Sequence, residues 1–78
     1  MQQQGTGEYV SHIFAIGETK WEVVIFSNGT TAVNKKWPCF AAGQEYKSAL
    51  EAANAYSSLE IQGQIWNAFS KAIKAFVI

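Results

Sequence analysis

The chain has one cysteine, Cys39, among its 78 residues, and only 15% of its residues are charged, against roughly 25% in an average globular protein. One cysteine cannot build the disulfide framework that small secreted domains use to reinforce a thin core, so a reducing compartment is expected. No stretch approaches the roughly 18 consecutive apolar residues of a membrane span. The first seven residues also lack the basic flank and apolar run of a signal peptide. These features favour a cytoplasmic protein without a membrane partner.

An excess of charge of either sign is also missing. Six Lys and Arg balance six Asp and Glu, and every acidic residue is a glutamate. Zero net charge excludes a polybasic role, because non-specific nucleic-acid binding depends on cations that neutralise phosphates. The 49% of hydrophobic residues and 14% of aromatic residues exclude an intrinsically disordered chain. The length allows one domain, residues 1–78, and no second one.

No constellation of catalytic or metal-binding residues can be found in the sequence. A metal site needs three or four ligands, and His12 and Cys39 provide two. A cysteine nucleophile needs a base and an orienting group, and the six glutamates are scattered rather than paired. We therefore predict a non-catalytic protein, with no catalytic residues, no cofactor and no metal.

The first half of the chain has the pattern of β-strands. After a polar lead of residues 1–7, β-branched and aromatic residues recur in runs at 9–16, 21–26 and 30–37. Pro38 cannot donate to a strand ladder, so it ends the third run. Residues 8–37 are thus predicted to form a three-stranded antiparallel β-meander.

Two turns set the predicted register of this meander. Asn28-Gly29 suits a two-residue hairpin turn, in which both central residues have positive φ. That turn sets Val24 opposite Val33, and Glu22 opposite Lys35, a favourable pair of opposite charges. A four-residue loop at 17–20 is predicted to set Ile16 opposite Trp21.

The second half of the chain has helical periodicity. Apolar residues recur at three- and four-residue spacing from Glu45 to Val77, which predicts a helical region at 45–77, broken near 57–63. Ser57 and Glu60 fit a capping box that would begin the second helix, and residues 58–62 alternate as a short strand would. The predicted fold class is α+β, with two C-terminal helices packed on one face of the sheet.

The predicted sheet is apolar on both faces, whereas an antiparallel sheet with one solvated face normally alternates apolar and polar residues. Helices that follow a meander most easily cover one face. The other face is therefore expected to bind a partner protein. The predicted binding residues are Tyr9, Ile13, Val24, Phe26, Val33 and Trp37.

Two function hypotheses follow. The first is a small regulator or inhibitor that occludes a partner protein, with homodimerisation as a related role of the same face, because self-association would stabilise so small a domain. The alternative is a nucleic-acid-binding domain, in which Lys35 and Lys36 contact phosphates and sheet aromatics stack on bases. In the first hypothesis these two lysines lie at the rim of the binding surface.

Overall fold

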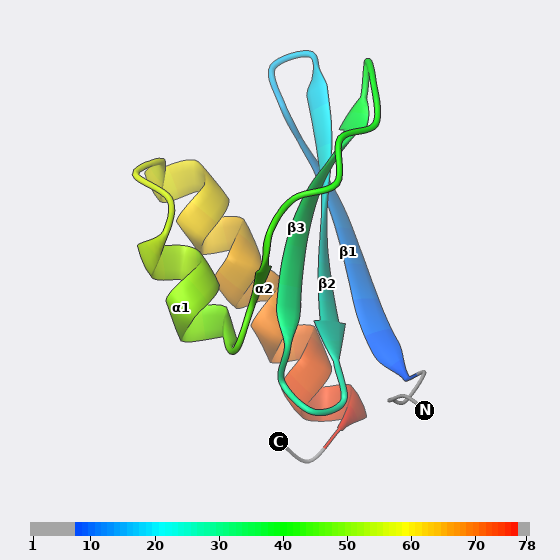
Figure 1. The fold of residues 1–78 in the computed structure, drawn as a ribbon, viewed down its shortest axis with the longest axis vertical. Helices are drawn as coiled ribbons and strands as arrows, with labels where there is room; N and C mark the ends of the chain where they lie inside the picture. Colours follow the sequence, from blue (N-terminus) through cyan, green and yellow to red (C-terminus); the bar gives the residue numbers. More distant parts are fainter. Residues whose placement is uncertain (1–7, 77–78) are drawn as a thin grey trace.

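The computed structural model describes residues 8–76. The predicted polar lead at 1–7 and the last apolar position of the helical region, Val77, lie outside the described residues. The molecule has two layers, a twisted antiparallel sheet and a pair of helices that cover one of its faces (Figure 1). The prediction of an α+β fold with both helices on one face is confirmed.

The sheet has four strands in sequential order. These are β1 (Tyr9–Ile16), β2 (Thr19–Phe26), β3 (Thr31–Trp37) and the short β4 (Glu45–Tyr46), each antiparallel to the one before it. The three predicted strands are present. The sequence pattern had placed residues 45–46 in the helical region, and this prediction is wrong.

The first hairpin has a tighter turn than predicted. Ile16 pairs with Thr19 across a turn that consists of Gly17 and Glu18, and Trp21 pairs with Phe14 instead of Ile16. The difference from the predicted register is two residues along one strand. Because side chains alternate with a period of two, this shift leaves the predicted faces of β1 and β2 unchanged.

The register of the second hairpin differs from the prediction by one residue. Unlike the two-residue shift of the first hairpin, a shift of one residue exchanges the faces of the strand. Its loop has three residues, Ser27 to Gly29, and the N–H of Gly29 donates to the carbonyl of Phe26 at 2.8 Å. Gly29 has φ +95°, as expected for a type I turn followed by a left-handed residue. Val33 therefore pairs with Val23, and the side chains of β3 from Thr31 to Lys35 point to the face opposite to the predicted one. A register shift opposite Lys20 and Trp21 then returns Trp37 to its predicted face.

After β3 the chain turns back along the edge of that strand. The Trp37–Pro38 peptide bond is cis, and Ala41 forms a backbone bridge with Lys35. Gly43 then lies so close to β3 that a Cβ atom at this position would be 1.6 Å from the carbonyl oxygen of Val33. Only glycine fits this contact, so Gly43 brings the returning segment onto the edge of β3.

The helices are α1 (Ala49–Asn54) and α2 (Leu59–Ala75). Ser48 caps α1 by accepting a hydrogen bond from the Glu51 N–H, and Ser58 caps α2 by accepting one from the Ile61 N–H at 3.2 Å. The break between the helices lies at 55–58, and Gly63 lies inside α2. Neither of the two alternatives for this segment, a cap at Ser57 or a short strand at 58–62, is observed, because Ser58 caps α2 and the helix begins at Leu59.

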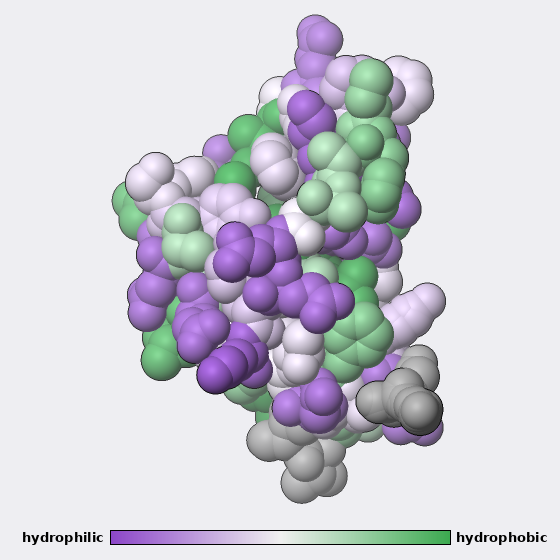
Figure 2. All heavy atoms as spheres, in the orientation of Figure 1, coloured by the Kyte–Doolittle hydropathy of each residue, from purple (hydrophilic) through white to green (hydrophobic). Residues whose placement is uncertain are grey.

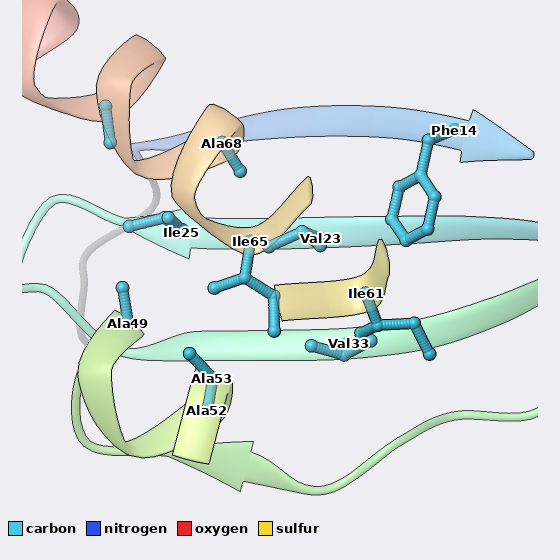
Figure 3. Close-up of a cluster of buried hydrophobic side chains, with 11 residues drawn as sticks. Phe14, Val23, Ile25, Val33, Ala49, Ala52, Ala53, Ile61, Ile65 and Ala68 are labelled. Atoms are coloured by element: carbon cyan, nitrogen blue, oxygen red, sulfur yellow. The ribbon is translucent and has the colours of Figure 1, made fainter. Parts of the chain in front are cut away.

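The core fills the space between the two layers (Figure 3). α2 packs over β1 and β2, and α1 over β3 and β4. The alanines of α1 are buried and allow its backbone to approach the sheet closely. The buried residues are Phe14, Val23, Ile25, Val33, Ala49, Ala52, Ala53, Ile61, Ile65, Ala68 and Ala72.

Candidate functional site

The face of the sheet that the helices leave uncovered is the candidate site, and we call it the open face. Its members follow from the strand register, since directly paired residues point to the same side of a sheet. They are Tyr9, Ser11, Ile13 and Ala15 of β1, Lys20, Glu22, Val24 and Phe26 of β2, and Ala32, Asn34 and Trp37 of β3.

Large apolar side chains on the open face remain accessible to solvent. Tyr9, Ile13 and Trp37 keep 54%, 59% and 58% of their surface exposed. The rings of Tyr9 and Phe26 lie against each other, with their centroids 5.9 Å apart and their planes tilted by 33°. This pair covers part of Phe26, which is half-buried. In Figure 2 hydrophobic residues reach the surface as separate patches between hydrophilic ones.

All but one of the predicted binding residues lie on the open face. The exception is Val33, which points toward the helices and is only 1% exposed. Its predicted position depended on the two-residue Asn-Gly turn, and the three-residue loop turns β3 over. Ala32, which the predicted register placed on the other face, lies on the open face beside Val24.

The centre of the open face is polar. The Ser11 hydroxyl donates to Oε2 of Glu22 at 2.5 Å, and Nζ of Lys36 lies 3.6 Å from Oε1. The side chain of Glu22 is 17% exposed, so these partners compensate a carboxylate that is largely covered. The predicted pairing of Glu22 with Lys35 is wrong, because Glu22 lies opposite Asn34. The Glu22 carboxylate therefore lies among apolar groups, with Ile13 directly opposite Glu22.

The two lysines do not form a common basic patch. Lys35 pairs with Trp21, whose side of the sheet faces the helices, whereas Lys36 reaches Glu22 on the open face. Nζ of Lys36 also lies 5.7 Å from the ring centroid of Phe40, within the range of a cation–π contact. The charge of Lys36 is thus already engaged by groups of the same chain.

His12 is part of a polar cluster on the other side of β1. Its Nε2 lies 2.7 Å from Oε1 of Gln64, and its Nδ1 lies 2.9 Å from Nζ of Lys71. An amide oxygen accepts and an ammonium donates, so the two contacts suit a ring that donates from Nε2 and accepts at Nδ1. Both ring nitrogens of His12 thus contact side chains of α2. Cys39, the other residue considered as a metal ligand, is exposed in the segment after β3.

Sequence reasoning missed two groups of exposed apolar residues. Phe40 follows β3 and is exposed, and Leu59, Trp66 and Ile73 are exposed on α2. The last three are spaced by seven residues, so they lie along one line of the helix. Trp66 and Ile73 belong to the three- and four-residue periodicity that predicts the helix, and Leu59 to the segment in which the break is predicted. Periodicity alone does not distinguish these exposed positions from buried ones.

Within the described part of the chain, no group of three or more His, Cys, Asp or Glu side chains could hold a metal ion. None of the helices described here is long and apolar enough to cross a membrane. Comparisons with protein-family models, with curated proteins and with solved structures find no match.

Proposed function

We propose that this chain is a non-catalytic protein-binding module that regulates or inhibits a partner protein by covering part of its surface. The observation that supports the proposal most directly is the one-sided helix layer, which leaves Tyr9, Ile13 and Trp37 exposed on the open face. Protein interfaces favour aromatic anchors over charged residues.

The arrangement of the open face fits docking better than chemistry. Tyr9 and Phe26 lie at one end of the face and Trp37 at the other, while Ile13 and Glu22 lie opposite each other in the middle. A partner that buries the apolar ends would also cover the Glu22 carboxylate. Because Ser11 and Lys36 already compensate this carboxylate, its burial costs less than that of an unpaired charge.

The nucleic-acid alternative gains less from this geometry. It needs cations next to stacking aromatics on one surface, and Lys35 and Lys36 belong to opposite faces of β3. Lys36, the lysine on the open face, forms an ion pair with Glu22. Binding phosphate would have to break that pair.

The test is an affinity capture from the native cell with the wild-type protein and a set of variants, followed by measurement of the affinity of the captured partner. Tyr9→Ala and Trp37→Ala should each weaken binding by about 2 kcal/mol or more, roughly 30-fold in Kd, because they remove exposed aromatic anchors. Leu50→Ala is the matched control, since Leu50 is similarly exposed on α1, in the layer opposite the open face.

The double variant Lys35→Ala, Lys36→Ala separates the two hypotheses. It should change affinity for a protein partner by less than about 1 kcal/mol and act mainly on the association rate. A steep loss of binding with added salt, together with loss of DNA or RNA binding in this variant, would support the alternative instead. A partner whose affinity responds to Leu50→Ala but not to Tyr9→Ala or Trp37→Ala would refute docking on the open face.

A further inference from the structure

Strand β1 forms one edge of the sheet, and it lacks the features that normally prevent an edge from pairing. Its eight residues, YVSHIFAI, contain no charged residue, proline or glycine, and its ladder with β2 has no bulge. Natural edge strands are usually shortened, bulged or given charges, because an exposed edge is a template for another strand. The opposite edge is protected in this way, since β4 has only two residues.

The register shows which backbone groups of β1 point outward. Ile16 and Thr19 close a two-residue turn, and the carbonyl of Glu8 accepts from the N–H of Ser27. Pairs that exchange hydrogen bonds alternate along an antiparallel ladder, so the even-numbered residues of β1 bond to β2. The N–H and C=O groups of the odd-numbered residues point away from β2, and among residues 8–76 no strand lies beyond them. These outward-pointing residues are Tyr9, Ser11, Ile13 and Ala15.

We propose that β1 pairs with β1 of a second copy of this chain, antiparallel across a two-fold axis, so that two four-stranded sheets form one continuous sheet. The outward-pointing backbone N–H and C=O groups of one copy must hydrogen-bond to those of the other copy. An odd-numbered residue of one β1 can therefore pair only with an odd-numbered residue of the other. The register that satisfies all the outward groups is centred on His12. It sets Tyr9 opposite Ala15 and Ser11 opposite Ile13 of the other copy.

The side chains of β1 fit this register on both faces. On the helix side Val10 lies opposite Phe14 of the second copy, which is an apolar pair, and His12 lies opposite His12 of that copy. β1 contains no Lys, Arg, Asp or Glu, so no two such charges meet along the pairing. Gln64 and Lys71 lie on either side of His12, and a two-fold rotation reverses their order. Lys71 of one copy therefore faces Gln64 of the other copy and not its Lys71, which avoids repulsion between like charges.

A second copy fits this edge better than an extended segment of an unrelated protein. The chain has no net charge, so two copies do not repel each other at long range. A domain of this size has a small core, and association stabilises the folded state by mass action. The pairing does not depend on the open face having a partner, and it would place two open faces side by side on one sheet.

Sedimentation equilibrium on the purified protein, from about 1 µM to about 1 mM, tests the proposal. The expected mass rises with concentration to about twice that of one 8.6 kDa chain. Ser11→Pro removes an outward N–H that β2 does not use, and proline is tolerated at such edge positions. This variant should raise the dimer Kd at least about tenfold, because both copies carry the substitution and the dimer loses two intermolecular hydrogen bonds. Ser11→Ala is the matched control, because it removes the hydroxyl bonded to Glu22 but keeps the backbone N–H, and it should dimerise like the wild type.

Amide hydrogen exchange provides a second readout that needs no variant. At low concentration the amides of Tyr9, Ser11, Ile13 and Ala15 should exchange fast while their even-numbered neighbours are protected, and high concentration should protect all of them. A monomer at every concentration overturns the proposal, as does protection of the odd-numbered amides that is independent of concentration. A dimer that Val24→Lys dissociates and Ser11→Pro does not would place the interface on the open face and overturn pairing at the edge.

Discussion

Gly29 provides the positive φ on which the second hairpin depends. A Cβ at this position would have no heavy atom within 4 Å, so a larger side chain meets no steric obstacle, but φ is +95°. Gly29→Val should therefore destabilise the domain by more than about 1 kcal/mol through backbone strain alone, since β-branched residues are strained at positive φ. Thermal or denaturant unfolding measures this loss.

Gly29→Asn serves as the control for that substitution. Asparagine tolerates left-handed backbone better than other non-glycine residues, so its loss of stability should be smaller than that of Gly29→Val. Equal unfolding midpoints for Gly29→Val and the wild type would show that the loop does not hold a left-handed residue at this position.

Tyr56 is the described residue with a clearly shifted pKa. Partial burial, with a smaller contribution from the neighbouring Tyr46 phenol, raises the pKa of Tyr56 from 10.0 to about 12. The two rings meet edge to face, with centroids 6.4 Å apart. A raised pKa means that the folded state holds the phenol proton more tightly than the unfolded state does. The associated stability is complete below pH 10 and is lost as the pH rises from about 10 to 12.

Denaturant unfolding at pH 9, 10 and 11 should therefore show a decline in stability with pH that is shallower in Tyr56→Phe than in the wild type. The other ionisable groups are the same in both proteins, so the difference between the two curves reports on Tyr56. Absorbance titration of the folded wild type should show one late phenol that Tyr56→Phe lacks. Identical slopes in the two proteins would contradict the raised pKa.

The strands differ in how well the local sequence predicts their bounds. The bounds of β1 were predicted as observed, because Tyr9 to Ile16 forms a strand with clear turn signals after it. β4 could not be predicted, since two residues carry no period. Its place depends on the contact of Gly43 with the Val33 backbone, which lies on a different segment of the chain.

The cap of α2 shows how local signals compete. Ser57 and Ser58 are adjacent, and Glu60 made Ser57 the better match to a capping box, yet Ser58 accepts from the Ile61 N–H. Starting the helix one residue later does not change its periodicity. The choice therefore depends on how the chain leaves α1 and on the burial of Ile61, and neither can be read from the serines themselves.

Ser58→Ala should destabilise the domain by about 1 kcal/mol, because the first turn of α2 loses the side-chain acceptor for one of its backbone N–H groups. Ser57→Ala is the matched control, and it should change stability by less than about 0.5 kcal/mol, as expected for an exposed residue without a cap. The reverse order of the two effects would place the cap at Ser57. Denaturant unfolding of both variants decides between them.

At the scale of the whole molecule, the sequence predicts the α+β fold class and the layer of helices on one side of the sheet, but it predicts the wrong face for most side chains of β3. The predicted faces of β1 and β2 are correct, because a register error of two residues leaves each side chain on the same face of the sheet. The positions of Tyr9, Ile13, Val24 and Phe26 on the open face are therefore predicted correctly. The predicted faces of Thr31 to Lys35 in β3 are wrong because Asn28-Gly29, which favours a two-residue turn, lies in a three-residue loop. The observed register buries Thr31 and Val33, whereas the predicted one would turn Asn34 and Lys36 toward the helices.

α2, the last element of the described chain, packs on β1, the first, and this has a consequence for the order of events during synthesis. The strands β1, β2 and β3 are synthesised before α2, since synthesis proceeds from the N-terminus. Their inner side, with Val23 and Ile25, then has no helix to cover it, and a sheet of this size needs such packing to be stable. The chain therefore completes its core only after translation has passed Ala72, and until then the inner side chains of the sheet have no complete helix to pack against.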